Sequence, residues 1–136
     1  MAKKKTKTKI RQELDSMYSR YIRLRDADEN GMCSCISCGD VKHWKKMQNG
    51  HYASRTCYST RWDDDNCHTQ CLACNRFREG NKIWYRRKLV EMYGEDKVRK
   101  IEDKSLEDVK YTKSDYEEML EFYTKEVAEL LKRVKD

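Results

Sequence analysis

Two Cys-x-x-Cys pairs constrain this 136-residue chain more than any other feature of its sequence. Cys35 forms one pair with Cys38, and Cys71 forms the second with Cys74. A two-residue gap lets both thiolates of a tight turn reach one tetrahedral ion at about 2.3 Å. We therefore predict that these four cysteines bind a structural zinc ion. A wider C-x4-C spacing leaves Cys33 as an alternative to Cys35.

The composition favours metal binding over disulfide bonds. Charged residues make up 40% of the chain, and its mean hydropathy is −1.12. No window approaches eighteen consecutive apolar residues, and no apolar stretch follows the basic N-terminus, so we expect neither a membrane span nor a signal peptide. We therefore expect a cytoplasmic protein, in a reducing compartment where seven cysteines, an odd number, do not form a disulfide framework.

The net charge of +6 is unevenly distributed. Residues 1–93 carry 20 lysines and arginines against 11 acidic residues, whereas residues 94–136 carry 10 against 13. A basic body predicts a polyanionic partner, although lysine-rich surfaces also serve solubility. Residues 1–9 contain no large apolar residue after Met1, and we interpret them as a disordered basic arm that contacts phosphates without reading base sequence.

The spacing of apolar residues predicts helices at both ends of the chain. A 3.6-residue period predicts an N-terminal helix within residues 10–30. Residues 31–93 form the predicted zinc-bound module, which is loop-rich before a helix over 82–93 that ends at Gly94. Residues 94–136 form a helical extension, whose last helix we expect to begin at a capping box of Ser114 and Glu117.

The last helix has an apolar seam whose residues alternate in steps of four and three. The seam consists of Tyr116, Leu120, Tyr123, Val127, Leu130 and Val134. This spacing is typical of a coiled coil and predicts a possible homodimer through the C-terminal helix. Packing of the same face on the first helix is an equally good interpretation.

The residues between and just after the cysteine pairs resemble a nuclease motif. His51 in Gly-His-Tyr is followed by Asn66, and Asn75 comes directly after Cys74. This order resembles the HNH (ββα-metal) nucleases. The run from Arg61 to Asn75, followed by Gly-Asn, is similar to the lambda NinG (Rap) recombination-nuclease family.

The resemblance implies an α+β protein with a zinc-stapled ββα-metal module between helices. It implies a structure-directed endonuclease acting on branched DNA, such as Holliday junctions or D-loops, and located in the host cytoplasm if phage-encoded. A neutral imidazole can accept a proton from water, so we assign the general base to His51. Asn66 would bridge backbone groups of the loop and orient His51. Asn75 would bind the catalytic Mg²⁺ or Mn²⁺.

The chain departs from the HNH pattern at Gly50, where many of these enzymes have a metal-binding aspartate. We expect His68 as a substitute ligand, because Asn66 and His68 are two apart in an extended segment and would share a face. The acidic residues 63–65 are alternatives, although such a run is usually a solvated turn.

Basic and aromatic residues supply candidate DNA contacts. Guanidinium matches phosphate geometry, so three arginines are candidate phosphate clamps, and the helix over 82–93 provides a second basic face. These residues are Arg55, Arg61 and Arg76, then Lys82, Arg86 and Arg87. The three tryptophans either stack on unpaired bases or fill the core.

Other classes of function remain open from the sequence. The main alternative is a non-catalytic zinc module that binds nucleic acid. A protein-interaction adaptor that works through its acidic C-terminal helix is a further alternative, and a thiol redox role is the weakest.

Overall fold

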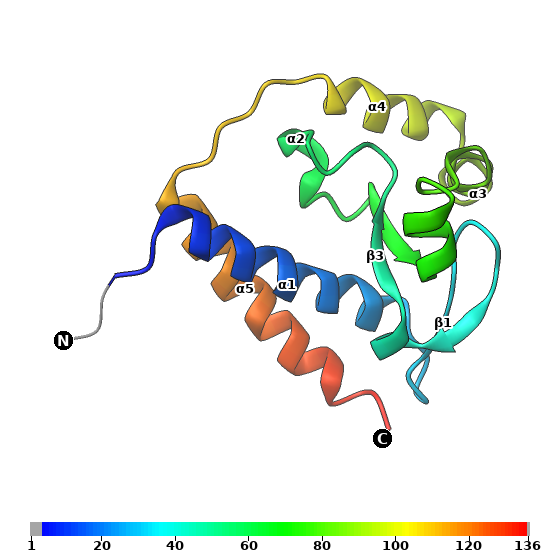
Figure 1. The fold of residues 1–136 in the computed structure, drawn as a ribbon, viewed down its shortest axis with the longest axis horizontal. Helices are drawn as coiled ribbons and strands as arrows, with labels where there is room; N and C mark the ends of the chain where they lie inside the picture. Colours follow the sequence, from blue (N-terminus) through cyan, green and yellow to red (C-terminus); the bar gives the residue numbers. More distant parts are fainter. Residues whose placement is uncertain (1–3, 136) are drawn as a thin grey trace.

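The computed structural model describes residues 4–135 and has a mixed α+β architecture with two small two-stranded sheets (Figure 1). In chain order the elements are α1 (Lys7–Arg25), β1 (Met32–Ser34), β2 (Val41–His43), the 3₁₀ turn η1 (Trp44–Lys46), β3 (Gln48–His51), α2 (Tyr58–Arg61), β4 (Cys67–Gln70), the π-helical turn η2 (Ala73–Phe77), α3 (Lys82–Tyr93), α4 (Glu95–Ser105) and α5 (Lys113–Leu131). The predicted α+β class is confirmed at this level. None of the helices in the described part of the chain has the apolar length needed to cross a bilayer.

Helix α1 begins earlier than the sequence predicted. The Thr6 hydroxyl accepts a hydrogen bond from the Lys9 amide at 3.1 Å, so the helix starts at Lys7. Lys5 forms an ion pair of 2.8 Å with Glu13, eight residues further on. The predicted disordered arm over residues 1–9 is therefore wrong for residues 7–9, and its first three residues lie outside the described ones.

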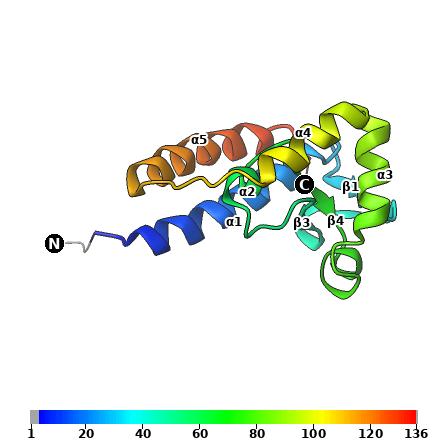
Figure 2. The same ribbon diagram turned by 90° about the horizontal axis from the view of Figure 1, so that it is seen from above.

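Helices α1 and α5 lie side by side and run in the same direction (Figures 1 and 2). The segment 106–112 returns from α4 to the start of α1, which makes this parallel arrangement possible. The Tyr123 ring lies 4.8 Å from that of Tyr18 and 4.9 Å from that of Tyr21, measured between centroids. Seam residues Tyr116 and Val127 are buried against the rest of the chain. The seam thus packs on the first helix, and a second copy would have to displace α1 to use it.

The capping box of α5 lies two residues before the predicted one. The Thr112 hydroxyl accepts from the Asp115 amide, and the Asp115 carboxylate accepts from the Thr112 amide at 2.8 Å. Ser114 is therefore inside the helix rather than at its cap. Both pairs fit the capping pattern, and the chain uses the one whose first residue has extended backbone.

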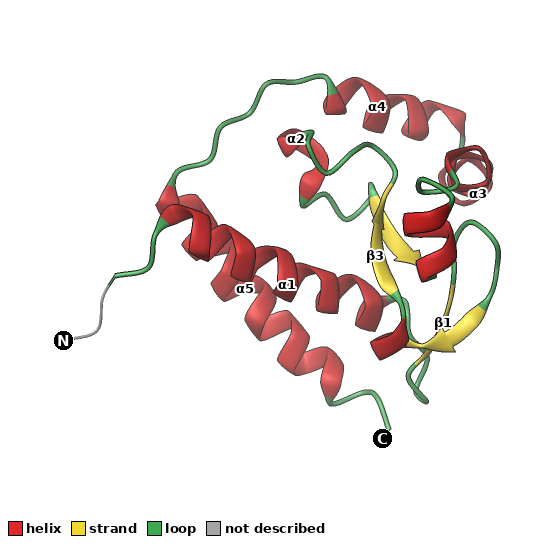
Figure 3. Ribbon diagram, in the orientation of Figure 1, coloured by secondary structure: helices red, strands yellow, loops and turns green. Residues whose placement is uncertain are grey.

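The two sheets are antiparallel hairpins, shown in yellow in Figure 3. Strands β1 and β2 pair with Cys33 opposite Lys42, and the first cysteine pair lies in their connecting loop. Strands β3 and β4 pair with His51 opposite Cys67. Helix α3 covers this second hairpin through Tyr85, which is fully buried. The helix over 82–93 ends before Gly94, as predicted.

Candidate metal centre and histidine cavity

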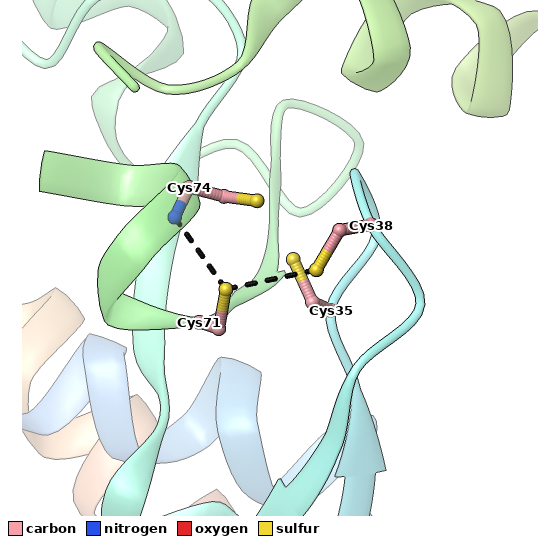
Figure 4. Close-up of side chains that lie close together, drawn as sticks. All are labelled: Cys35, Cys38, Cys71 and Cys74. Atoms are coloured by element: carbon pink, nitrogen blue, oxygen red, sulfur yellow. Dashed lines mark hydrogen bonds between the residues drawn. The ribbon is translucent and has the colours of Figure 1, made fainter. Parts of the chain in front are cut away.

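The two Cys-x-x-Cys pairs converge on one point (Figure 4). Ligand atoms of Cys35, Cys38, Cys71 and Cys74 all lie within 4.8 Å of one another, and the sulfurs of Cys38 and Cys71 are 3.7 Å apart. A tetrahedral site with Zn–S bonds of about 2.3 Å requires sulfurs about 3.8 Å apart. The four cysteines can therefore bind a metal such as zinc. Cys33 is not part of this cluster, since its thiol points to the Lys42 carbonyl.

Hydrogen bonds to the Cys74 sulfur favour the thiolate that a metal needs, whereas burial raises the pKa values of Cys38 and Cys71. Burial alone raises the pKa of Cys74, but hydrogen bonds from Asn81 and the neighbouring cysteines lower it to about 7. The Asn81 amide donates to the Cys74 sulfur at 3.4 Å, and the Cys74 backbone amide donates to the Cys71 sulfur at 3.4 Å. Cys67, by contrast, is a buried core residue whose pKa is raised by burial, which agrees with a filling role.

His51 lies at the end of β3, on the wall of a cavity of about 420 Å³. Its Nε2 lies 2.9 Å from the carbonyl oxygen of Arg61. A carbonyl only accepts, so this contact requires the hydrogen on Nε2 and leaves the lone pair on Nδ1. The pKa of His51 is lowered to about 4, mainly by burial and also by the positive charges of Arg55 and Arg61, against the opposing effects of that hydrogen bond and of the Asp15 charge. The imidazole is therefore neutral at pH 7.

Asp15 of α1 holds the segment that orients His51. Its carboxylate accepts from Arg61 Nε at 3.1 Å, from Arg61 Nη2 at 2.5 Å and from Trp62 Nε1 at 3.0 Å. Arg61 is buried and is committed to this ion pair, so the prediction that it clamps phosphate does not match its placement. Sequence reasoning missed Asp15, because nothing distinguishes it from other charged residues of an amphipathic helix.

Asn66 bridges the loop between β3 and β4. Its side-chain oxygen accepts from the Ala53 amide at 2.7 Å, and its nitrogen donates to the Ala53 and Thr60 carbonyls at 3.1 and 3.0 Å. The side chain has no exposed surface. These bonds fix the loop that contains the Arg61 carbonyl, and so they act on His51 indirectly.

Asn75 lies on η2 and lines the same cavity as His51. Its side-chain nitrogen donates to Gln48 Oε1 at 2.7 Å, and no hydrogen bond from a described residue reaches its Oδ1. Asn49 also lines the cavity, and its Oδ1 is buried without a partner. Sequence reasoning missed Asn49, although its position two residues before His51 on a strand places both on one face.

His68 lies outside the lining of the cavity that contains His51. Its ring nitrogens lie 3.2 Å from the Tyr85 hydroxyl and 2.9 Å from the Tyr93 hydroxyl. It pairs with Gly50 in the hairpin, so it points to α3 while His51 faces the cavity. Asn66 does not share its face, because the strand begins only at Cys67. The placement of His68 therefore does not support its predicted metal role.

The acidic residues 63–65 also lie outside the cavity lining. Asp63 is paired with Lys104 at 3.0 Å and Asp65 with Lys97 at 3.4 Å. The Asp64 carboxylate accepts from two tyrosine hydroxyls of α1. They serve as structural partners, so the alternative that this run binds the catalytic metal is not supported by their placement.

Only part of the predicted basic set is free to contact phosphate. Arg55 and Arg76 line the cavity, and Arg87 is exposed on α3. Arg55 also lies 3.3 Å from the Asp15 carboxylate, but its side chain is 61% exposed. Lys82 donates to the His51 and Tyr52 carbonyls, the second at 2.6 Å. Arg86 is bound by the carboxylates of Glu95 and Glu102 at 2.7 and 3.0 Å.

Packing explains the glycine at the position where an aspartate was expected. A Cβ atom on Gly50 would lie 2.0 Å from Oε1 of Gln70. Gln70 is fully buried, and its Nε2 donates to Ser37 Oγ and to the Gly80 carbonyl. No side chain fits there without displacing Gln70.

Comparison with known proteins places the chain in a phage family. The family model described as "Bacteriophage Lambda NinG protein" matches residues 1–133. The chain is 32% identical over 107 residues to protein ninG of Escherichia phage lambda and 34% identical over 107 residues to protein ninG of Salmonella phage P22. Each match covers 74% of this chain, and the chain spans about half the length of these relatives. No solved structure matches. The chain therefore belongs to the NinG family of lambdoid phage proteins.

Proposed function

We propose that this chain is a metal-dependent DNA endonuclease that uses His51 as its general base. The observation that carries the proposal is the tautomer and protonation of the His51 imidazole. Its Nε2 donates to the Arg61 carbonyl, its pKa is lowered to about 4 by burial, and it lines a cavity together with Asn75. A neutral imidazole with a fixed tautomer has its Nδ1 lone pair available to accept a proton.

In the proposed reaction, water attacks the phosphorus of a phosphodiester bound at the cavity. Nδ1 of His51 accepts the proton of that water, its oxygen forms the new P–O bond, and the bond to the 3′ oxygen breaks. Arg55 and Arg76 neutralise phosphate charge at the cavity wall. Asn66 and Asp15 are positioning residues. Asn66 binds the Thr60 carbonyl and Asp15 binds the Arg61 side chain, so both hold the segment whose Arg61 carbonyl accepts from His51.

A divalent cation, Mg²⁺ or Mn²⁺, would stabilise the charge on the leaving 3′ oxygen when bound. The residues of this chain that fit it are Asn75, whose Oδ1 has no donor among the described residues, and Asn49, whose Oδ1 is buried without a partner. Amide oxygens suit a hard cation that retains several waters and takes its charged ligands from the substrate phosphate.

We propose zinc as the ion of the four-cysteine cluster, with a structural role. Strand β3, strand β4 and the helical turn that carries Asn75 come in this order, with the short helix α2 between the two strands, and this order supports the ββα-metal interpretation. The cluster joins the β1–β2 hairpin to that turn, so the metal would fix the position of Asn75 next to Cys74. Branched recombination intermediates are the proposed substrate, and the cytoplasm of the infected cell is the proposed location.

One observation favours the alternative of a non-catalytic zinc module that binds nucleic acid. The cavity lining contains one carboxylate among the described residues, that of Asp15, and it is engaged by Arg61, Trp62 and Arg55. A site without a free carboxylate binds Mg²⁺ weakly in the absence of substrate.

A cleavage assay separates the two functions. Purified protein is incubated with a labelled four-way DNA junction or a matched linear duplex, with and without Mg²⁺. We expect metal-dependent nicking that is lost in His51→Ala and retained in His43→Ala, a matched histidine variant outside the cavity. Tight junction binding without cleavage in Mg²⁺ or Mn²⁺ would instead establish the binding module.

A further inference from the structure

The segment from η2 to the middle of α3 exposes large apolar side chains among positive charges. Phe77 is 78% exposed, Ile83 72% and Trp84 54%. The exposed charged residues of 72–88 are five cations and one carboxylate; they are Arg76, Arg78, Lys82, Arg87, Lys88 and Glu79. Of the five cations, Lys82 already donates to two backbone carbonyls. We call residues 72–88 with these side chains the η2–α3 surface. Exposed aromatic rings cost free energy in water, so a surface with several of them is typical of a binding site.

Trp84 is the best-defined aromatic group of the η2–α3 surface. It lines a groove of about 870 Å³ that lies between α3 and the loop carrying Cys38. The Arg87 guanidinium lies 4.9 Å from the centre of the Trp84 ring, and Lys88 comes one helical turn after Trp84. The other two tryptophans, Trp44 and Trp62, are 8% and 9% exposed and fill the core. More than half of the Trp84 side chain is therefore free to contact a partner.

Phe77 brings the η2–α3 surface next to the candidate catalytic cavity. It follows Asn75 and Arg76, which line that cavity, on the same π-helical turn. The turn that joins η2 to α3 has positive φ at three successive residues, 79–81. Helix α3 starts directly after this turn, at Lys82.

We propose that the η2–α3 surface binds unpaired bases of DNA, with Trp84 and Phe77 as stacking platforms. The net positive charge of residues 72–88 is complementary to phosphates, and flat aromatic rings stack on bases of any sequence. This inference rests on the proposed function, which it deepens by naming its substrate class as DNA with unstacked bases beside the cleavage site. Paired bases in a continuous duplex would not reach the rings.

Tryptophan fluorescence tests the proposal without any cleavage. The protein is titrated with (dT)10, with a ten-base-pair duplex, and with an abasic oligonucleotide of equal length that keeps the phosphates. Divalent cations are not added, so an inactive nuclease does not affect the result. We expect (dT)10 to quench the fluorescence, the abasic strand to bind with little quenching, and Trp84→Phe to lose the quenching while it keeps the affinity.

A double variant measures the contribution of the rings. Stacking of one base contributes about 5- to 150-fold in affinity. We therefore expect Phe77→Ala with Trp84→Ala to weaken (dT)10 binding at least fivefold, by fluorescence anisotropy of a labelled strand. Phe122→Ala is the matched control, since this ring is 55% exposed on α5. A double variant that binds (dT)10 within twofold of Phe122→Ala would overturn the proposal, as would quenching by the abasic strand equal to that by (dT)10.

Discussion

Replacement of Asp15 by alanine is expected to destabilise the protein by about 2–4 kcal/mol. Asp15 accepts hydrogen bonds from Arg61, Trp62 and Arg55. Its side chain is 22% exposed and that of Arg61 is 10% exposed. Removal of one partner of a fully buried pair costs about 3–5 kcal/mol, whereas an exposed pair contributes about 0–1 kcal/mol. Partial burial places this pair between the two limits.

A double-mutant cycle isolates the ion pair. The free energy of unfolding is measured in urea for Asp15→Ala, Arg61→Met and the double variant. We expect a coupling free energy of at least about 1.5 kcal/mol. The control cycle uses Glu121 and Lys125 of α5, which are 3.1 Å apart but more than two-thirds exposed. Their coupling should stay below about 0.5 kcal/mol.

The same variant tests whether α1 supports the histidine. Without Asp15, the Arg61 backbone is held less firmly, so the His51 ring should become more hydrated. Loss of the Asp15 charge by itself lowers the pKa of His51, but burial is the largest cause of its shift. Hydration should therefore raise the pKa, measured by NMR titration, from about 4 toward its ordinary value of 6.5. Coupling no larger than in the control cycle, together with an unchanged His51 titration, would refute this reasoning.

Three further results are expected. Removal of the metal by a chelator, or the substitution Cys71→Ser, should abolish cooperative unfolding, because the cluster joins two hairpin-linked segments that bury little surface. The chelator should release one zinc per chain, as measured with a colorimetric dye. Gly50→Ala should cost about 1–3 kcal/mol in urea unfolding, since its Cβ would meet the immobile Gln70 side chain; an unchanged midpoint would contradict this packing. The pKa values of His51 and His68 are both about 4 when folded, mainly through burial, so the unfolded chain binds more protons between pH 4 and 6.5. Unfolding free energy should therefore fall as pH is lowered through this range, and a pH-independent urea midpoint would disprove it.

Local patterns in the sequence predicted the features whose cause is local. The two-residue gaps within each cysteine pair led directly to the four-sulfur cluster, because a tight turn fixes both thiols at once. The helix over 82–93 was predicted with its end at Gly94, since a glycine with φ of 88° terminates it. The motif formed by His51, Asn66 and Asn75 pointed to residues that the fold brings together. His51 and Asn75 line the cavity, and Asn66 braces the loop behind it.

Features that depend on contacts between distant segments could not be read from the sequence. Asp15 and Arg61 are 46 positions apart, and only the fold brings them together. His68 was placed on the wrong face, because the strand starts at Cys67 and the alternation could not be counted from Asn66. Whether a basic residue is free or paired also depends on which carboxylates the fold places around it. Arg86, for example, is paired with Glu95 and Glu102.

The packing also shows why the helices and the metal module form one structural unit. Leu24 of α1 and Val127 and Leu130 of α5 share a buried cluster with Cys35 and Cys74. The cysteine cluster thus provides both the metal ligands and part of the apolar surface on which the helix pair packs. A module this small buries too little apolar area to be stable alone, and the helices supply what it lacks. The boundaries drawn at residues 30 and 94 from sequence therefore separate patterns of amino acids, whereas the core crosses both of them.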